Sequence, residues 1–591
     1  MAEIDKERIL AGCDEAQRAA ITSSAAPLLV IAGAGAGKTS VLTKRIAWRV
    51  ASGEAAPSHV LALTFTRKAA SELRTRLFDL GLPAPVAAGT FHSLALGQLR
   101  TRALDEGREP PTVLSSKSRL LARIVPSART KKARGRPAIS RGDLVFAVAT
   151  EIEWAKARRI SPDHYADAAE TAHRTPPAPI DDVSAWYAAY EEAKSRSGQL
   201  DFEDLLERLA TAIQSDRGFA AVQRWRFRHI FVDELQDANA AQLRLLDAWL
   251  GARDDLFCVG DARQAIYGWN GADPTAVTRF AEHYPGATVI ELSTNYRSTP
   301  QVVSVASSVF GDDAKFQSAP SPDGEPPTVT AYETEIAEAA AVVAGLRRRR
   351  VPGTPWSSCA VLARTNAQLA VFEEALGAHG IPFRSSSRDS LRDRPEVRAS
   401  LALLTKNNTE SFSRWIADLR DEMSDEEPDD GRFVLFDLAS EYAETEISPT
   451  PSGFRAFFDS ALREQAPLGR RDGVDLLTFH RAKGLEWPVV FVTGIEDGYL
   501  PIAHARGRAA VDEERRLFYV ALSRATSELH CSWSKSRSLA GREQPRHPSP
   551  FLAEVAASCR AIERERRFEL ERAKESLASV RALLDSTAPS S

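Results

Sequence analysis

The fold of this chain is decided by one stretch, Leu28-Leu29-Val30-Ile31-Ala32-Gly33-Ala34-Gly35-Ala36-Gly37-Lys38-Thr39-Ser40. An apolar, strand-like run ends in a loop of alternating glycine and alanine, and a helix-compatible segment follows as far as Val50. A strand, a glycine-rich loop, a lysine, a hydroxyl residue and a helix in this order are typical of a phosphate-binding P-loop. Ala32 replaces the usual first glycine, but the intact Gly-Lys-Thr favours a P-loop over an ordinary glycine-rich turn.

The loop carries the groups that a nucleoside triphosphate requires. Backbone N–H groups of small residues can face the phosphates, and the N-terminus of the following helix adds a favourable dipole. Lys38 is expected to reach the β- and γ-phosphates, and the Thr39 hydroxyl is expected to bind Mg²⁺. The predicted nucleotide-binding residues are Ala32, Gly33, Ala34, Gly35, Ala36, Gly37, Lys38, Thr39 and Ser40.

A second strand-like run, residues 228–232, leads directly into Asp233-Glu234. Mg²⁺ prefers hard oxygen ligands, so Asp233 is the expected second metal residue beside Thr39, acting through water. Glu234 is then placed to polarise the water that attacks the γ-phosphate. Paired acids at a strand end are sometimes only solvated, but together with a P-loop they predict Mg²⁺-dependent ATP hydrolysis.

The bulk composition indicates a multidomain chain without a membrane span. A chain of 591 residues exceeds the size at which single cores stop growing. No apolar run approaches the roughly 20 residues that cross a bilayer, and the first residues have no secretory apolar core. The five cysteines form no Cys-x-x-Cys pair, so neither disulfides nor zinc are expected. These features predict a cytoplasmic protein.

The charge balance does not itself suggest a nucleic-acid partner. There are 76 basic and 80 acidic residues, for a net charge of −4, so contacts to phosphates require a local basic channel. Phe65 and His92 follow strand-like runs near basic residues, which suits a single strand, although a core role for Phe65 is equally compatible. Gln264 could sense a γ-phosphate, and Trp269 a few residues later could stack on a base.

Later segments complete an ordered series of motifs. Leu292–Ser298 supplies an aromatic residue and an arginine that could act as a finger. Residues 475–487 and 513–525 look like helicase motifs V and VI. The chain therefore resembles superfamily 1 DNA helicases of the UvrD/PcrA/Rep type over nearly all of its first 555 residues.

The resemblance implies an α/β fold with two RecA-like P-loop NTPase domains, each a parallel sheet flanked by helices, with helical insertions. ATP is expected in the cleft between the two domains. The implied segments are 1–97 and 201–297 (domain 1A), 98–200 (helical insertion 1B), 298–395 and 473–556 (domain 2A), 396–472 (a reduced 2B-like insertion) and 557–591 (a charged helical tail).

The resemblance also assigns roles residue by residue. The catalytic set is Lys38, Asp233, Glu234, Gln264, Arg297 and Arg524, in which the last three contact the γ-phosphate. Gln17 and Tyr296 are expected to hold adenine, and Glu486 the ribose. The implied single-stranded DNA contacts are Phe65, His92, Tyr267, Trp269, Arg364, Asn366 and His480.

The function implied is an ATP-dependent 3′→5′ translocase or helicase in DNA repair or replication restart. Its expected partners are single-stranded DNA, single-strand/duplex junctions and repair or replication proteins. Two other classes stay open from the residues: a nucleotide-gated DNA-binding switch that does not travel, and an RNA helicase. The intact catalytic residues weigh against the switch, and the resemblance weighs against RNA.

Three features depart from the family pattern. Arg263, Ala265 and Asn270 replace common residues of motif III without removing a catalytic group. Only about seventy-five residues separate the segment near Glu396 from motif V, where relatives place a much longer 2B domain. This short region includes an acidic run, residues 421–431, which should repel duplex phosphates. Unwinding is therefore expected to be either unrestrained or poorly supported.

The tail shows an apolar spacing of three and four residues. Two heptads are too short for a reliable coiled coil, so a docked or frayed helix is the leading interpretation and a partner-binding helix the minority one. The residues that keep this spacing are Leu570, Ala573, Leu577, Val580 and Leu584.

Overall fold

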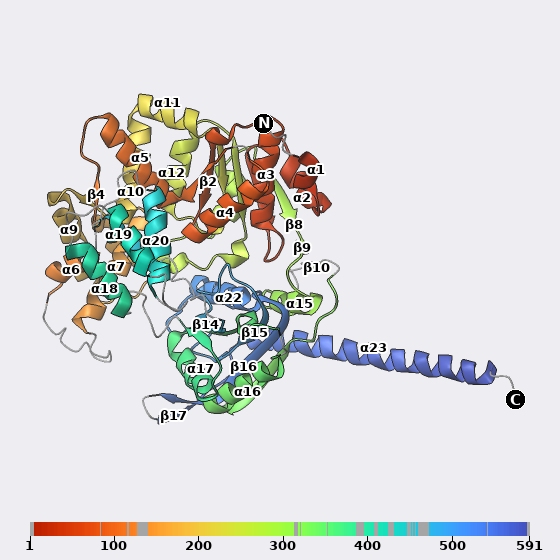
Figure 1. Cartoon of the computed structure of the whole chain (residues 1–591). Helices are drawn as coiled ribbons and strands as arrows, with labels where there is room; N and C mark the ends of the chain where they lie inside the picture. The colour runs from red at the N-terminus through yellow and green to blue at the C-terminus, as the bar shows by residue number, and fades with distance from the viewer. Residues whose placement is uncertain are drawn as a thin grey trace. The chain divides into compact units, whose positions relative to one another are not determined.

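The structure is a computed structural model of the chain, shown in Figure 1. It describes residues 5–587 except 83, 115–116, 127–139, 312–316, 319–320, 351–352, 386–394, 407–411, 423–430, 446–450, 452, 456, 459–471 and 540–541. The chain divides into two compact units, residues 1–292 with 389–471 (unit 1) and 293–388 with 472–591 (unit 2). Among the described residues, no helix is long and apolar enough to cross a membrane.

Unit 1 is built on a six-stranded sheet in which all neighbouring strands run parallel, in the order β3-β2-β6-β7-β1-β8. Its strands are β1 (Leu28–Ala32), β2 (Val60–Thr64), β3 (Ala87–Thr90), β6 (His229–Val232), β7 (Leu256–Gly260) and β8 (Thr288–Leu292). The central strands read as continuous apolar runs because a parallel sheet is covered on both faces.

Helices cover both faces of this sheet and form two separate cores. Leu28 and Val30 of β1 belong to one core and Leu29 to the other, as alternation along a strand requires. The first core includes α2 and α3, and the second includes α5, α10 and α12. The helices of this part are α1 (Lys6–Leu10), α2 (Glu15–Thr22), α3 (Lys38–Ala51), α4 (Arg67–Asp79), α5 (Phe91–Asp105), α10 (Phe202–Ser215), α11 (Arg217–Arg226), α12 (Ala240–Leu250), α13 (Thr275–Thr278) and α14 (Phe280–His283), with the short helical turns η1 (Pro57–His59), η3 (Leu235–Asp237), η4 (Ala262–Gln264) and η5 (Gly268–Asn270).

A helical insertion lies between α5 and α10 and has its own apolar core around Trp154 and Tyr165. Its elements are β4 (Thr112–Val113), α6 (Lys117–Ile124), α7 (Arg141–Ala157), η2 (Pro162–His164), α8 (Tyr165–Thr171), α9 (Ile180–Arg196) and β5 (Gln199–Leu200). The α5 helix passes through residue 98 without a break.

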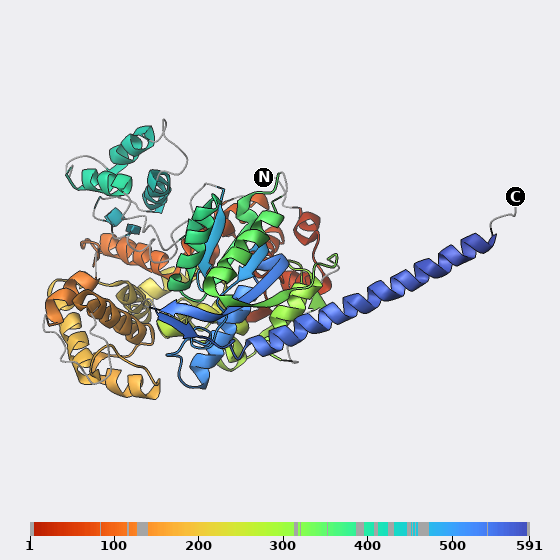
Figure 2. The same ribbon diagram turned by 90° about the horizontal axis from the view of Figure 1, so that it is seen from below.

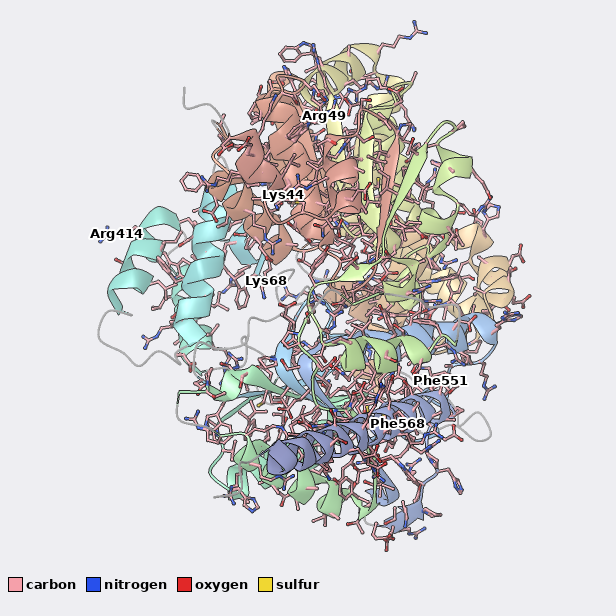
Figure 3. All side chains as sticks on the ribbon, turned by 90° about the vertical axis from the view of Figure 1, so that its right-hand side faces the viewer. Lys44, Arg49, Lys68, Arg414, Phe551 and Phe568 are labelled. Carbon is pink, nitrogen blue, oxygen red and sulfur yellow. The ribbon has the colours of Figure 1, made fainter. Side chains whose placement is uncertain are left out.

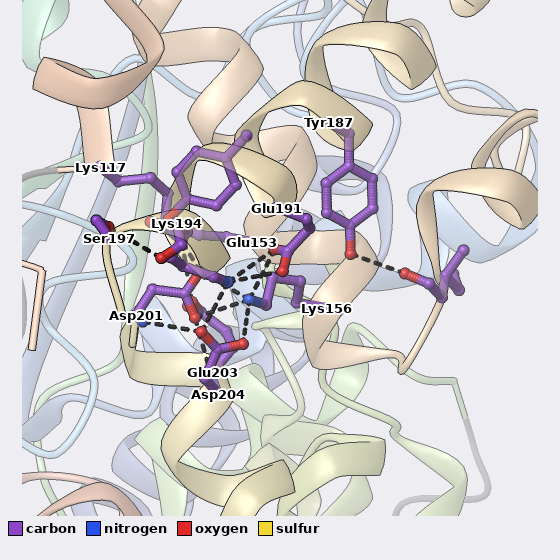
Figure 4. Close-up of polar contacts among 12 residues, drawn as sticks. Lys117, Glu153, Lys156, Tyr187, Glu191, Lys194, Ser197, Asp201, Glu203 and Asp204 are labelled. Atoms are coloured by element: carbon purple, nitrogen blue, oxygen red, sulfur yellow. Dashed lines mark hydrogen bonds and ion pairs between the residues drawn. The ribbon is translucent and has the colours of Figure 1, made fainter. Parts of the chain in front are cut away.

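A buried cluster of charges joins this insertion to the start of α10 (Figure 4). We call it the insertion cluster, comprising Lys117, Glu153, Lys156, Glu191, Lys194, Asp201, Glu203 and Asp204. Oxygens of Glu191, Asp201 and Asp204 lie within 4.8 Å of one another, the spacing of a metal site. The ammonium groups of Lys156 and Lys194 contact all three carboxylates, so lysines already supply the cations.

The short region between the two parts of unit 2 also packs as part of unit 1. Its helices are α18 (Pro395–Lys406), α19 (Phe412–Glu422) and α20 (Gly431–Thr445). An aromatic core, including Phe412, Trp415 and Phe454, holds it together. The Arg67 guanidinium carbon lies 3.6 Å from the ring centroid of Phe457, which anchors the region beside α4. Most of the predicted acidic run, residues 423–430, lies outside the described residues.

Unit 2 contains a second mostly parallel sheet in the order β11-β16-β15-β12-β14-β13, with β17 antiparallel to β16. Figure 2 shows strands of this unit in green and blue. Its strands are β11 (Thr328–Thr334), β12 (Cys359–Ala363), β13 (Phe383–Ser385), β14 (Val474–Thr478), β15 (Trp487–Val492), β16 (Ala525–Leu539) and β17 (Arg542–Pro545), beside a separate pair β9 (Thr294–Asn295) and β10 (Gln317–Ser318). Its helices are α15 (Pro300–Ser308), α16 (Glu335–Arg348), α17 (Asn366–Ala378), α22 (Arg508–Leu522) and α23 (Leu552–Thr587), with η6 (Trp356–Ser358).

The tail continues α23 rather than forming a separate helix. Its first turns contact α15 and β11, but every residue from Glu563 to Ser579 is exposed, including Phe568 at 66% (Figure 3). Leu570 and Leu577 of the apolar spacing are also exposed, whereas the side chains of Val580 and Leu584 lie outside the described set.

Candidate nucleotide and nucleic-acid site

The P-loop connects the carboxyl end of β1 to the first turn of α3. Gly35 and Gly37 have φ angles of 73° and 85°, in the left-handed region that glycine adopts without strain. Ala32 occupies the position of the usual first glycine, and its carbonyl oxygen accepts a hydrogen bond from Lys38 Nζ at 3.2 Å. The loop therefore holds Lys38 folded back over its own backbone.

Residues that follow β1 and β6 meet beside the loop, although β7 lies between these two strands in the sheet. The Thr39 hydroxyl donates a hydrogen bond to Asp233 Oδ2 at 3.1 Å. Lys38 Nζ lies 4.0 Å from Glu234 Oε1. Burial and the charge of Glu234 raise the pKa of Asp233 to about 7, against the opposing effects of Lys38 and Thr39. A buried carboxylate and a hydroxyl this close form a donor pair for a hard divalent cation.

A hydrogen-bond chain links Glu234 to the next motif. Glu234 has a left-handed φ of 52°, and its carboxylate accepts a short hydrogen bond from Gln236 Nε2. Gln236 Oε1 accepts from the Asp261 backbone N–H at 2.8 Å, and the Asp261 carboxylate accepts from Gln264 Nε2 at 2.7 Å. Because Gln236 is fully buried, it fixes the relation between the two motifs.

Gln236 and Asp261 were not among the residues predicted from the sequence. Both lie inside motif segments, at the ends of strands whose order along the sheet is not encoded locally. The sequence offered only a glutamine within an acidic run that follows a strand-like segment, and its burial, which requires partners, is visible only in the structure.

Gln17 belongs to a capping box at the start of α2, where its backbone N–H donates to Asp14 Oδ1 at 2.7 Å. Its Nε2 donates to the Ala36 carbonyl oxygen at 3.1 Å, so the side chain lies against the P-loop. A Cβ at Gly37 would come within 3.1 Å of that nitrogen. The position of Gln17 is thus coupled to the loop.

In unit 2, three of the predicted nucleotide residues gather beside β9. Arg297 Nε lies 2.5 Å from Glu486 Oε2, and Tyr296 is 44% exposed. Asn295 Oδ1 accepts hydrogen bonds from the backbone N–H groups of Arg297 and Ser298, which shapes this turn.

Arg524 is 1% exposed at the end of α22. Its guanidinium donates to the carbonyl oxygens of Val520 and Leu485 at 2.9 and 3.1 Å and to the Ser523 hydroxyl at 3.1 Å. These three contacts hold the guanidinium in place just beyond the last turn of α22.

The predicted DNA contacts of unit 1 differ in their surroundings and in their exposure. Phe65 packs against Phe91, with ring centroids 5.6 Å apart, at the margin of the second core. His92 lies 5.9 Å from the Phe202 ring, and desolvation together with Arg67 and Lys117 lowers its pKa to about 4. His92 is therefore neutral at pH 7. Trp269, on η5, is 47% exposed.

The predicted DNA contacts of unit 2 differ from one another. Arg364 forms a two-point ion pair with Glu514, at 2.9 and 2.7 Å, and that carboxylate is buried. Asn366 is exposed as the first residue of α17. Burial, Arg364 and Lys483 lower the pKa of His480 to about 3, so it too is uncharged at pH 7.

Comparisons with known proteins match both parts of the chain. The family described as UvrD/REP helicase N-terminal domain matches residues 13–285, and the UvrD-like helicase C-terminal domain matches 290–430 and 407–536. The ATP-dependent DNA helicase UvrD2 of Mycobacterium tuberculosis is 38% identical over 94% of this chain and 83% of its own length. DNA helicase II of Escherichia coli is 28% identical, covering 94% and 89%. The ATP-dependent DNA helicase PcrA of Bacillus subtilis is 28% identical, covering 93% and 86%.

Proposed function

The chain belongs to the UvrD-like helicase family, and from this membership we propose that it is an ATP-dependent DNA helicase that moves 3′→5′ along single-stranded DNA. The α/β fold with RecA-like domains, predicted from the sequence, is confirmed by that membership, and the parallel sheet of unit 1 and the mostly parallel sheet of unit 2 agree with it. We further propose a role in DNA repair or replication restart, with single-strand/duplex junctions as substrates.

One observation carries the proposal of ATP hydrolysis. Thr39 and Asp233 are 194 residues apart in the sequence, yet their side chains are hydrogen-bonded at the carboxyl edge of the sheet. Lys38 and Glu234 flank this pair. A phosphate-binding loop, a cation-binding oxygen pair and a second carboxylate are the parts that hydrolysis of a γ-phosphate requires.

The residues fit Mg²⁺, which would be held by the Thr39 hydroxyl and, through water, by Asp233. When bound, the ion would neutralise phosphate charge. Asp233 stays ionised most readily beside a cation, because burial and Glu234 otherwise raise its pKa. Glu234 would accept the proton of the attacking water, and Gln236 would keep its carboxylate oriented.

We propose that the remaining nucleotide residues act as the family pattern implies. Lys38, Gln264, Arg297 and Arg524 would contact the phosphates, with the arginines stabilising charge that develops during hydrolysis. The remaining P-loop residues would bind phosphates, Gln17 and Tyr296 adenine, and Glu486 the ribose. Glu486 is paired with Arg297 in the structure, so nucleotide binding would have to separate or share that pair.

We propose that single-stranded DNA contacts the residues at the family's DNA-binding positions. These are Phe65, His92, Tyr267, Trp269, Arg364, Asn366 and His480. Neutral His92 and His480 would contribute ring surface and hydrogen bonds rather than charge. The exposed Trp269 is best placed to stack on a base. Arg364 is also paired with Glu514 within unit 2, so a contact with the strand would have to share that ion pair.

Strand displacement on duplexes with a 3′ tail, a 5′ tail or no tail tests the proposal, with single-strand-stimulated ATPase recorded in the same samples. Unwinding of the 3′-tailed duplex alone is expected, and Lys38→Ala should abolish both activities. Displacement of only the 5′-tailed duplex would contradict the polarity. Strong ATPase without displacement would show a translocase whose short 2B-like region does not support unwinding.

A further inference from the structure

Helix α11 carries apolar residues on two faces. Ala220 and Gln223 are buried against unit 1, and Phe227 follows the helix into the second core. The opposite face presents an outer stripe, which we define as Gly218, Ala221, Val222 and Trp225, all exposed. Val222 is 58% exposed and Trp225 60%. A helix with apolar residues on its solvent side is typical of a contact surface.

Trp225 is held in place although it is exposed. The His59 ring stands edge-on to it, with centroids 4.6 Å apart, and His59 Nδ1 donates to the Arg226 carbonyl oxygen at 3.3 Å. The Arg228 guanidinium carbon lies 5.8 Å from the Trp225 ring centroid. A fixed aromatic side chain loses little conformational entropy when a partner covers it, which suits a binding anchor.

The stripe is bordered by positive charge. Residues 217–228 contain four arginines and no acidic residue, although the whole chain has a net charge of −4. Arg217, Arg226 and Arg228 are exposed. Arg253 donates a hydrogen bond to the Arg224 carbonyl oxygen at 2.8 Å, so a further arginine lies beside this border. Burial lowers the pKa of Arg253, and the charges of Arg224 and Arg228 lower it further.

Two acidic residues near this border are already paired with other basic residues. Asp216, the N-cap of α11, lies 3.0 Å from Arg102. Asp255 accepts two hydrogen bonds from Arg49, at 2.6 and 3.0 Å, and lies 2.6 Å from His229 Nδ1. Arg49 is in the last turn of α3 and is labelled in Figure 3. These contacts hold the pKa of Asp255 at about 2 despite its burial. These carboxylates are therefore engaged by basic residues other than the four arginines of the border.

The stripe is separate from the nucleotide-binding residues. Arg228 precedes the amino end of β6, whereas Asp233 follows the carboxyl end. The four residues of that strand span about 13 Å, so the two surfaces lie at opposite edges of the sheet. Figure 1 shows α11 at the margin of its unit.

We propose that the outer stripe of α11 and its arginine border are a docking site for an acidic, amphipathic segment of a partner protein. Trp225 and Val222 would anchor apolar side chains of that segment, and the small residues Gly218 and Ala221 allow close approach. The arginines match acidic flanks. Arginine and tryptophan are also the residues most enriched at energetically dominant positions of protein interfaces.

Two other occupants fit less well. A second copy of the chain in a symmetric dimer would place one arginine border against the other, which costs electrostatic energy. Nucleic acid would use the arginines and one ring face, but it would leave Val222 and Ala221 without a suitable contact.

The test is a selection of helical peptides from a displayed random library against the full chain, followed by affinity measurements on the selected peptides. We expect acidic peptides with apolar residues at helical spacing. Trp225→Ala should weaken their binding by about 30-fold, the effect of losing a dominant anchor. Arg226→Glu with Arg228→Glu should weaken it by about tenfold or more, and added salt should reduce the wild-type affinity.

Arg279→Glu is the matched control, because that arginine is 68% exposed elsewhere in unit 1. It should leave peptide affinity unchanged, and all variants should keep single-strand-stimulated ATPase, which shows that they fold. The proposal would be overturned if the selected peptides were basic. It would also be overturned if their affinity were unaffected by Trp225→Ala and by Arg226→Glu with Arg228→Glu.

A fluorine label on tryptophan distinguishes the other occupants. The Trp225 resonance, assigned with Trp225→Phe, should shift with the selected peptide and not with single-stranded or duplex oligonucleotides. A shift with oligonucleotides that Arg226→Glu with Arg228→Glu removes would show a nucleic-acid surface and refute the protein-docking proposal. A dimer that Trp225→Ala dissociates would refute it in favour of self-association.

Discussion

Replacing Lys156 with methionine tests how strongly the insertion cluster holds the helical insertion to the rest of unit 1. Lys156 Nζ lies 2.7 Å from Asp201, 2.6 Å from Asp204 and 3.0 Å from Glu191. Its side chain is 9% exposed and that of Asp201 is 3% exposed. Methionine retains much of the stem's volume, so the change removes mainly the charge.

The expected loss of stability depends on which cations remain near the three carboxylates. Removing one partner of a buried ion pair costs about 3–5 kcal/mol, because the other charge stays buried without compensation. Lys194 contacts the same three carboxylates, at 2.7 to 3.0 Å, and would keep part of the compensation. We therefore expect the lower end, about 3 kcal/mol.

Hydrogen exchange resolved by segment is the appropriate assay, because a chain of several domains does not unfold in one step. A loss of about 3 kcal/mol corresponds to roughly 100-fold faster exchange in α7, α9 and the start of α10. Arg196→Met is the matched control on α9: this arginine is 71% exposed, and its pair with Glu192 should contribute little. Equal exchange in the Lys156 variant and the control would refute the reasoning.

The pH dependence gives an independent check with a definite sign. Although burial opposes its charge, the nearby lysines, Lys156 foremost, hold the pKa of Asp201 well below the usual value. Asp201 therefore stays charged between pH 7 and 5 and adds no pH dependence there. In the variant this depression should be smaller, because only Lys117 and Lys194 remain to favour the charged form. Stability from a depressed carboxyl pKa is lost as the pH falls through the folded-state pKa, so lowering the pH from 5 to 3 should cost the variant segment less stability than the wild-type segment. An equal or larger loss in the variant, with exchange corrected for intrinsic rates, would contradict this.

Three further substitutions distinguish residues that act in DNA-stimulated ATP turnover from residues that stabilise the fold. Trp269→Ala should preserve ATP binding but remove most stimulation of turnover by single-stranded DNA, and normal stimulation would exclude a stacking role. Gln236→Leu should lower the DNA-stimulated kcat by about tenfold or more with little change in KM for ATP, because Glu234 loses its oriented partner; a change in KM alone would refute this. Arg364→Met should destabilise unit 2 by about 3 kcal/mol in hydrogen exchange, because Glu514 stays buried without its partner. Weaker DNA binding without faster exchange would instead make Arg364 a contact residue.

The sequence determined the chemistry of the nucleotide site because that chemistry is local. A glycine-rich loop needs its residues next to one another, so Lys38 and Thr39 could be identified from one short run. Asp233 and Glu234 could be identified in the same way, since a buried strand with acids at its end is a continuous pattern. The fold class followed from these strand-and-loop units and from the family resemblance.

Only the tertiary structure decided which distant groups neutralise or orient one another. The order of strands along a sheet is set by packing over the whole unit, so no local pattern shows that Gln236 joins Glu234 to Asp261. The pairing of Arg364 with Glu514, 150 residues later, is equally invisible in the sequence. The exposure of the outer stripe of α11 is likewise decided by the tertiary structure. The sequence shows which residues are apolar, but whether they are exposed depends on what packs against them.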